Sequence, residues 1–124
     1  MTTPDSHITV TEVDEILVAR FTEQPRFPSF ALATVFDGLL PKVEGCPSRC
    51  LLVDLSEISY LDSSSLGELS RLQGAIDKLE GKLAMCCVQE SLREILNVLR
   101  LDRLFAIYPD EATARQALLS GNAE

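Results

Sequence analysis

The chain has 124 residues, of which 46% are hydrophobic and 24% are charged. This length fits one globular domain that is stable without disulfide bonds or a structural metal ion. The formal net charge of -8 at pH 7 argues against nucleic acids and anionic membranes as ligands, because phosphate groups recruit stripes of Lys and Arg. A protein is the expected partner, and the acidity either steers a basic partner or only keeps the chain soluble.

Hydropathy predicts a cytoplasmic protein with no membrane insertion. The N-terminus lacks a basic start followed by an apolar stretch, and no segment approaches the roughly 18 apolar residues that span a bilayer.

The cysteines Cys46, Cys50, Cys86 and Cys87 show no CxxC spacing. Cys86 and Cys87 are adjacent in a predicted strand, so we expect their side chains on opposite faces, which disfavours joint binding of one ion. We predict small buried hydrophobic residues and no metal site. A disulfide between Cys46 and Cys50 is the less favoured alternative.

Two strands with a hairpin turn open the chain. Residues 7–13 alternate between apolar and polar side chains, and residues 16–21 follow as the second strand, with the turn at Val13-Asp14-Glu15. His7, the single histidine, has no partner at metal-ligand spacing and is expected to face solvent.

A loop, a helix and a central strand follow. Prolines predict a loop over residues 24–29, Ser29 can cap a helix, and Pro41 or the residues just after it end that helix. The apolar run over residues 50–55, broken only by Asp54, predicts a strand covered on both faces. We expect Asp54 to be a buried structural carboxylate held by backbone donors.

A second helix is predicted to begin within a serine run. Residues 56–61 indicate a short extended segment, and the sequence Asp-Ser-Ser-Ser then precedes an apolar stripe at helical spacing. Gly81 closes the helix, and residues 82–88 predict another buried strand. The stripe comprises Leu66, Leu69, Leu72, Ile76 and Leu79.

Two further helices flank a last strand over residues 104–108. Ser91 can cap the third helix, and Asp110 the fourth. Arg100 and Arg103, near the end of the third helix, are expected to complement its dipole rather than bind phosphate. The third helix carries an apolar stripe that we interpret as its core face rather than a docking surface, namely Leu92, Ile95, Leu96 and Leu99.

This element order predicts an α/β fold with a mixed β-sheet of about five strands and about four helices packed against it. We expect residues 1–124 to form a single domain, with its core over about residues 7–119 and short flexible ends.

The stretch from Leu51 to Ser56, followed by Ile58 to Gly67, resembles the signature of the STAS-domain family. An apolar strand ends in Asp54-Leu55-Ser56, and residues 62–67 read Asp-Ser-Ser-Ser-Leu-Gly where the family pattern is Asp-Ser-Ser-Gly-Leu-Gly. The resemblance continues through Gly81-Lys82-Leu83 and residues 95–105. It implies a STAS-like single domain related to the anti-sigma factor antagonists.

In antagonists of this family, an anti-sigma factor that is itself a serine kinase phosphorylates a serine of this segment, and a serine phosphatase reverses the reaction. The unphosphorylated form binds the kinase and frees a sigma factor. The resemblance places the phosphate on Ser64, with Ser63 as the alternative. The environment of the site would comprise Asp62, Ser63, Ser65, Leu66, Gly67 and Glu68.

Two departures from the family pattern concern kinase recognition. Ser65 replaces the motif glycine. If this position needs a positive φ, a serine would strain the turn by about 1–2 kcal/mol. If the position already lies in the first helical turn, a serine is acceptable. The loop over residues 24–29 presents Arg26 where related proteins commonly present an aspartate.

The sequence also allows other functional interpretations. A STAS domain can also be a phosphorylation-independent interaction subunit of a transporter or scaffold complex, and the serine run alone fits simple helix capping. A serine hydrolase is disfavoured because GxSxG is absent, and no phosphate-binding glycine motif occurs. We therefore expect no enzyme activity and no cofactor. We also expect the protein to be a monomer or a weak dimer.

Overall fold

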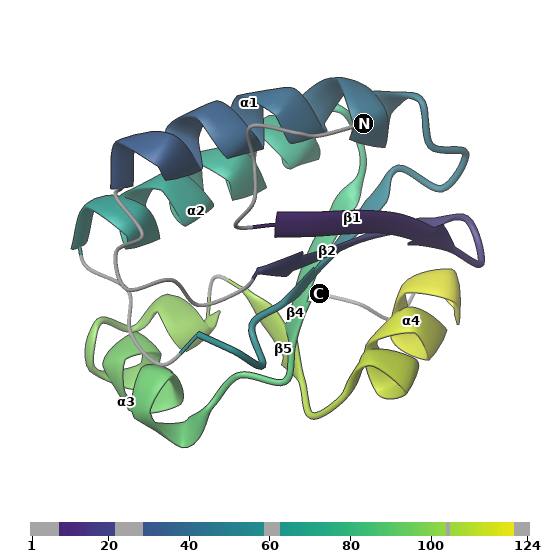
Figure 1. Ribbon diagram of the computed structural model, residues 1–124. Coiled ribbons are helices and arrows are strands. Elements are labelled where there is room, and N and C mark those ends of the chain that lie inside the picture. Colours follow the sequence, from purple (N-terminus) through teal and green to yellow (C-terminus); the bar gives the residue numbers. More distant parts are fainter. Residues whose placement is uncertain (1–7, 22–28, 59–62, 104, 121–124) are drawn as a thin grey trace.

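A computed structural model describes residues 8–21, 29–58, 63–103 and 105–120 (Figure 1). Within these residues, one mixed sheet has the strand order β1-β2-β3-β4-β5. β1 (Ile8–Val13) pairs with β2 (Ile16–Phe21) antiparallel, and the other three strands follow in parallel. These are β3 (Cys50–Asp54), β4 (Lys82–Cys86) and β5 (Ala106–Tyr108). The predicted mixed α/β fold is confirmed.

The hairpin between β1 and β2 has a two-residue loop, as predicted. Asp14 and Glu15 have φ angles of 54° and 68°, and Val13 pairs with Ile16 across the turn. Positive φ at both loop residues matches the right-handed twist of the two strands.

Helices cover both faces of the sheet (Figure 1). α1 (Ser29–Glu44), α2 (Ser63–Lys78) and α3 (Glu90–Val98) pack on one face, and α4 (Glu111–Ser120) packs on the other. Leu51 and Val53 of β3 face the first group, whereas Cys50 and Leu52 face α4. β3 is therefore buried on both faces, as its apolar run predicts.

α1 ends at Glu44, a few residues after Pro41 as predicted, and the completely buried Val43 anchors its last turn in the core. Two other predicted boundaries are wrong by a few residues. Residues 56–58 are not extended, because the backbone N–H of Ile58 donates to the carbonyl of Leu55 at 3.0 Å and closes a turn. β4 ends at Cys86, since Cys87 has a φ of 61°, outside the strand region.

The starts of α3 and β5 also differ from prediction. Gln89 is the N-cap of α3, without a side-chain capping bond, and Ser91 lies inside the first turn. Phe105 precedes β5, because its N–H donates to the carbonyl of Leu101 in the short 3-10 helix Leu101–Arg103. Asp110 caps α4 as predicted, accepting from the N–H of Thr113 at 2.7 Å.

Gly81 follows α2, but its role differs from the predicted one. The N–H of Gly81 donates to the carbonyl of Ile76 and that of Glu80 to the carbonyl of Asp77, so Glu80 takes the left-handed position with a φ of 62°. A Cβ at Gly81 would lie 2.2 Å from the carbonyl oxygen of Arg49. The glycine is needed for this close approach of two backbones.

Predictions for His7, for most of the loop over residues 24–29 and for residue 104 lie outside the described residues. Among the helices that the structure describes, none combines the length and apolar character required to cross a membrane.

Candidate functional site

The predicted site begins where β3 gives way to α2. β3 ends at Asp54, residues 55–58 form a turn, and α2 starts at Ser63. Ser63, Ser64 and Ser65 are thus the first three residues of α2, where backbone N–H groups have no intrahelical partner. Asp62 and the side chains of these serines lie outside the described parts of the structure.

Ser65 occupies a helical position. Its place as the third residue of α2 gives it a negative φ, so serine is accommodated there without the strain that a left-handed glycine position would impose. Of the two interpretations of this departure, the structure supports the first helical turn.

The other three predicted site residues play different parts. Leu66 is 4% exposed and belongs to the core, whereas Gly67 is exposed and a Cβ added there meets nothing. Glu68 accepts from Arg71 at 2.8 Å, and Arg71 also reaches Asp37 of α1 at 3.3 Å. Gly67 and Glu68 therefore offer surface next to the serines, and Leu66 fixes the helix in the core.

A side-chain bond joins the segment before α2 to the start of α3. The Nε2 of Gln89 donates to the carbonyl oxygen of Ser56 at 2.8 Å, and the N–H of Leu55 donates to the carbonyl of Cys86 at 3.2 Å. α3 is therefore held beside the turn that leads to the serines, and both lie on the same side of the molecule (Figure 1).

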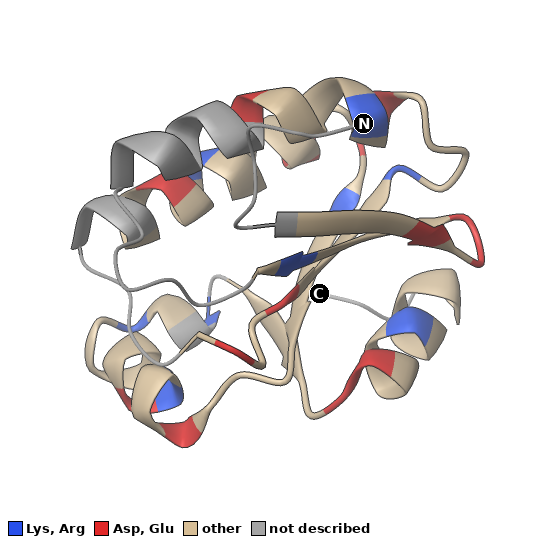
Figure 2. Ribbon diagram, in the orientation of Figure 1, with Lys and Arg blue, Asp and Glu red and all other residues tan. Residues whose placement is uncertain are grey.

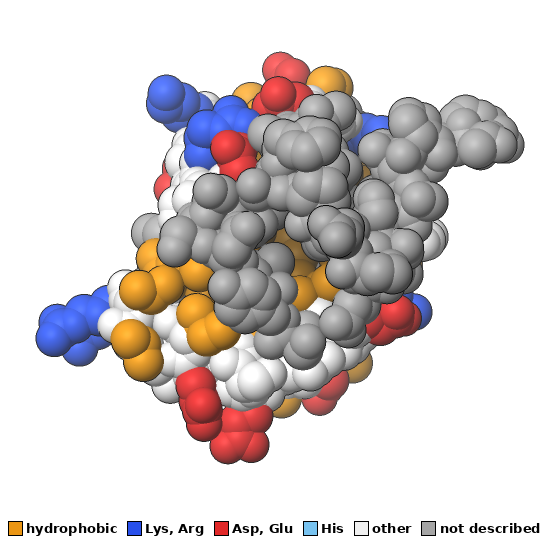
Figure 3. Space-filling view, turned by 60° about the vertical axis from the view of Figure 1, so that its left-hand side comes forward, with side chains coloured by type: hydrophobic (Ala, Val, Ile, Leu, Met, Phe, Trp, Pro, Cys, Tyr) orange, Lys and Arg blue, Asp and Glu red, His pale blue; other side chains and the backbone are white. Residues whose placement is uncertain are grey.

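The outer face of α3 exposes apolar side chains. Val98 is 79% exposed and Leu99 50%, and with Ile95 they line a shallow depression of about 330 Å³. Figure 3 shows hydrophobic side chains gathered on this face, and Figure 2 shows charges of both signs around α3. We call Ile95, Val98 and Leu99 the α3 apolar surface.

The predicted core face of α3 is correct only in part. Leu92 and Leu96 are fully buried, and Ile95 packs partly against the core. Leu99 was predicted to be buried but is half exposed, because α3 ends at Val98 and Leu99 is its C-cap. Sequence reasoning missed Val98. An apolar residue outside the helical stripe was the feature that could have pointed to it.

Asp54 is a buried carboxylate, 2% exposed. Its Oδ1 accepts from the backbone N–H of Ser56 at 2.9 Å, which confirms the predicted backbone donor. Its Oδ2 accepts from the Nε of Arg20 at 3.2 Å, a partner that sequence reasoning missed. The strand register brings the two side chains together, because Arg20 of β2 is paired with Asp54 of β3.

The four cysteines are free thiols, and Cys46, Cys50 and Cys86 are buried as predicted. The Sγ of Cys46 donates to the carbonyl of Glu15 at 2.8 Å rather than bonding to Cys50. The predicted opposite orientation of Cys86 and Cys87 is wrong. Both pack on the α4 side of the sheet, because Cys87 leaves the strand at a φ of 61°.

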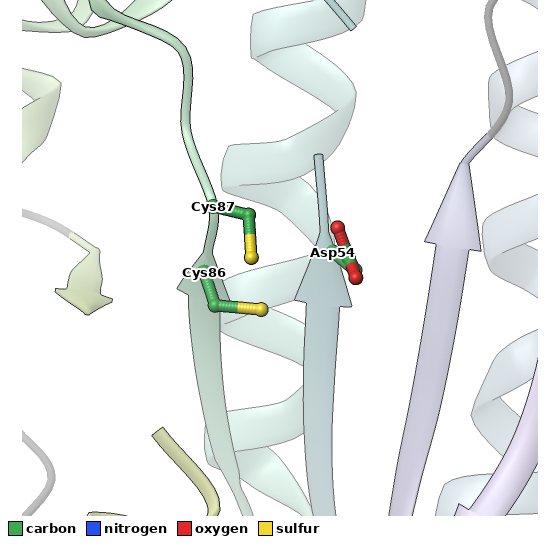
Figure 4. Close-up of side chains that lie close together, drawn as sticks. All are labelled: Asp54, Cys86 and Cys87. Atoms are coloured by element: carbon green, nitrogen blue, oxygen red, sulfur yellow. The ribbon is translucent and has the colours of Figure 1, made fainter. Parts of the chain in front are cut away.

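Asp54, Cys86 and Cys87 come together as a result (Figure 4). The carboxylate and the two Sγ atoms all lie within 4.8 Å of one another. Burial raises the pKa of the Cys86 thiol, and the charges of Cys87 and Asp54 raise it further. An anionic Cys86 would be repelled by both of its neighbours.

The chain is similar in sequence and in fold to known proteins. The family model of the STAS domain matches residues 7–114. A candidate anti-sigma factor antagonist from Thermotoga maritima is 21% identical, with a TM-score of 0.74 over 91% of this chain and 95% of that one.

Two other solved structures are similar. An anti-sigma-factor antagonist (STAS) domain protein from Planctomyces limnophilus is 24% identical, with a TM-score of 0.72 over 90% of this chain and 97% of that one. The Bacillus cell fate determinant SpoIIAA in its phosphorylated form is 13% identical, with a TM-score of 0.66 over 89% of this chain and 98% of that one. At these identities the structural likeness shows a shared fold.

Proposed function

The chain belongs to the STAS-domain family, and we propose that it is an anti-sigma factor antagonist that acts as a phosphorylation-controlled binding switch. The unphosphorylated form binds a serine-kinase anti-sigma factor, and a phosphate on Ser64, with Ser63 as the alternative, releases it. The observation that carries the proposal is the start of α2 at Ser63, which places the serine run in the first turn of that helix. The phosphorylated form of the similar SpoIIAA supports it.

A phosphate at this position is compatible with the fold. Phosphoserine adds about -1.5 to -2 charge at pH 7. The free N–H groups and the dipole at a helix N-terminus favour an anion by roughly 0.3–1 kcal/mol, so the modified serine need not disturb α2. The effect of the phosphate therefore falls on a bound partner.

The α3 apolar surface supplies the other part of the binding surface. It lies on the same side of the molecule as the start of α2, and the bond from Gln89 to Ser56 holds the start of α3 beside the turn after β3. A partner that covers both would bury Val98 and Leu99, which are exposed in the free chain. A phosphate enclosed in such an interface loses water without a matched cation.

The size of this effect suffices for a switch. Losing about 3–4 kcal/mol of binding free energy weakens the complex some 100- to 1000-fold. In this proposal the protein is a cytoplasmic binding protein rather than an enzyme, and a serine phosphatase restores the binding form.

A phosphosite map of the protein recovered from its own host tests the proposal. Intact mass and peptide fragmentation are compared for the wild type, Ser64→Ala and the control Ser70→Ala, which alters a serine farther along α2. We expect one phosphate that vanishes in Ser64→Ala and persists in Ser70→Ala. A chain that stays unmodified in every growth condition would instead identify a phosphorylation-independent subunit of a transporter or scaffold complex.

A further inference from the structure

The cluster of Asp54, Cys86 and Cys87 lies apart from the proposed switch. It occupies the carboxyl ends of β3 and β4 on the sheet face that α4 covers, whereas α2 and α3 pack on the opposite face. Figure 4 shows the three side chains next to one another at the ends of β3 and β4, with the sulfur atom of Cys86 directed toward Asp54. The proposed function makes no use of these side chains.

The separations fit ligands of one small ion. In a tetrahedral zinc site with Zn–S bonds of about 2.3 Å and Zn–O bonds of about 2.0 Å, ligand atoms lie roughly 3.3–3.8 Å apart. The three ligand atoms here all lie within 4.8 Å of one another. An ion would therefore have to draw together any pair of ligand atoms that lies near this upper limit.

The carboxylate is already oriented. One oxygen of Asp54 accepts from the N–H of Ser56 and the other from Arg20, and each oxygen retains a second lone pair. Hydrogen bonds of this kind commonly hold metal-binding carboxylates in place. The charges also balance, because a divalent ion together with Arg20 neutralises two thiolates and one carboxylate.

The backbone at Cys87 provides an independent indication. A non-glycine residue with a φ of 61° is uncommon, and this conformation is what turns Cys87 to the same side of the sheet as Cys86. Unusual backbone conformations concentrate at functional sites. Cys87 is also partly exposed, which gives an ion a route from solvent.

We propose that Asp54, Cys86 and Cys87 bind one thiophilic divalent cation of the zinc class, with water as the fourth ligand. Each thiol gives its proton to solvent as its sulfur binds the ion. The site is independent of the phosphorylation switch, so either proposal can fail without the other.

The test uses the full chain, kept reduced with a phosphine and free of chelators. Zn²⁺ binding is followed by native mass spectrometry and by titration, and Co²⁺ serves as a probe because thiolate ligands give it charge-transfer absorption. We expect one ion per chain in the wild type. In Cys87→Ser we expect the absorption to disappear and the Zn²⁺ affinity to fall by more than about 100-fold, beyond the effect of losing an outer-shell contact.

Matched variants separate the cluster from other thiols. Cys46→Ser alters a buried cysteine elsewhere in the fold and should bind as the wild type does. Cys86→Ala should lose the ion as well; if it fails to fold, the partly exposed Cys87→Ser decides alone. A wild-type chain that binds no ion, or a folded Cys87→Ser that binds with wild-type affinity, overturns the proposal.

Discussion

Arg20 and Asp54 face each other across two parallel strands, and the Nε of Arg20 donates to the Oδ2 of Asp54 at 3.2 Å. The Asp54 side chain is only 3% exposed, whereas that of Arg20 is 52% exposed. The buried carboxylate is therefore neutralised by a guanidinium group that is half exposed to solvent. That cation also approaches Glu111 at the start of α4.

Replacing Arg20 should destabilise the fold. Arg20→Met keeps the apolar stem but leaves the buried carboxylate without its cation, so the free energy of unfolding should fall by about 1–3 kcal/mol. Urea denaturation followed by circular dichroism measures this change. The control Arg71→Met removes the exposed ion pairs of Arg71 with Glu68 and with Asp37 of α1 and should change stability little. Equal losses in the two variants would contradict this account of Asp54.

The α3 apolar surface should matter for binding and not for folding. Val98→Ser should weaken the complex with the partner kinase by about tenfold, because it removes an apolar contact worth roughly 1.4 kcal/mol. Leu119→Ser is the matched control, since Leu119 is 53% exposed on α4, across the sheet. Calorimetry on both variants checks the prediction, and it is wrong if Leu119→Ser weakens binding as much as Val98→Ser.

Two glycines should respond in opposite directions to alanine. At Gly81 the new Cβ would meet the carbonyl oxygen of Arg49 at 2.2 Å, so Gly81→Ala should cost about 1–3 kcal/mol of stability. At Gly74, inside α2, a Cβ meets nothing, so Gly74→Ala should stabilise by roughly 0.5–1 kcal/mol. Thermal denaturation of both variants tests the pair, and a stable Gly81→Ala would refute the close approach.

Asp110 should make α4 sensitive to acid. Its hydrogen bond from the N–H of Thr113 lowers the pKa of the carboxyl, so its contribution to stability is present above the unfolded pKa and is lost as the pH falls through the lower folded pKa. Asp110→Ala should therefore be less stable than the wild type at neutral pH and converge with it in acid. Asp110→Asn should retain a cap at both pH values. A gap between wild type and Asp110→Ala that is unchanged in acid would contradict the prediction.

Local patterns in the sequence predicted most of the fold. The alternation before Asp14, the apolar run of β3 and the stripe of α2 each have a periodicity that one kind of element satisfies. The errors fall at element ends. They arise where a backbone hydrogen bond closes a turn, as from Ile58 to Leu55, or where a non-glycine residue takes a positive φ, as at Glu80 and Cys87.

The candidate site could be predicted only as a segment. The motif placed the serines at a helix start, but the exposure of Val98 and the bond from Gln89 to Ser56 depend on how α3 docks. The cysteine cluster could not be predicted, because strand alternation places Cys86 and Cys87 on opposite faces until the backbone of Cys87 is known.

The central claim is tested most directly by the affinity of the chain for the proposed partner kinase, measured with unmodified protein and with protein carrying one phosphate on Ser64. The kinase can be purified from the host by following phosphate transfer to this chain. The account predicts that the phosphate weakens binding some 100- to 1000-fold, as a loss of about 3–4 kcal/mol requires. Equal affinity of the two forms would contradict it.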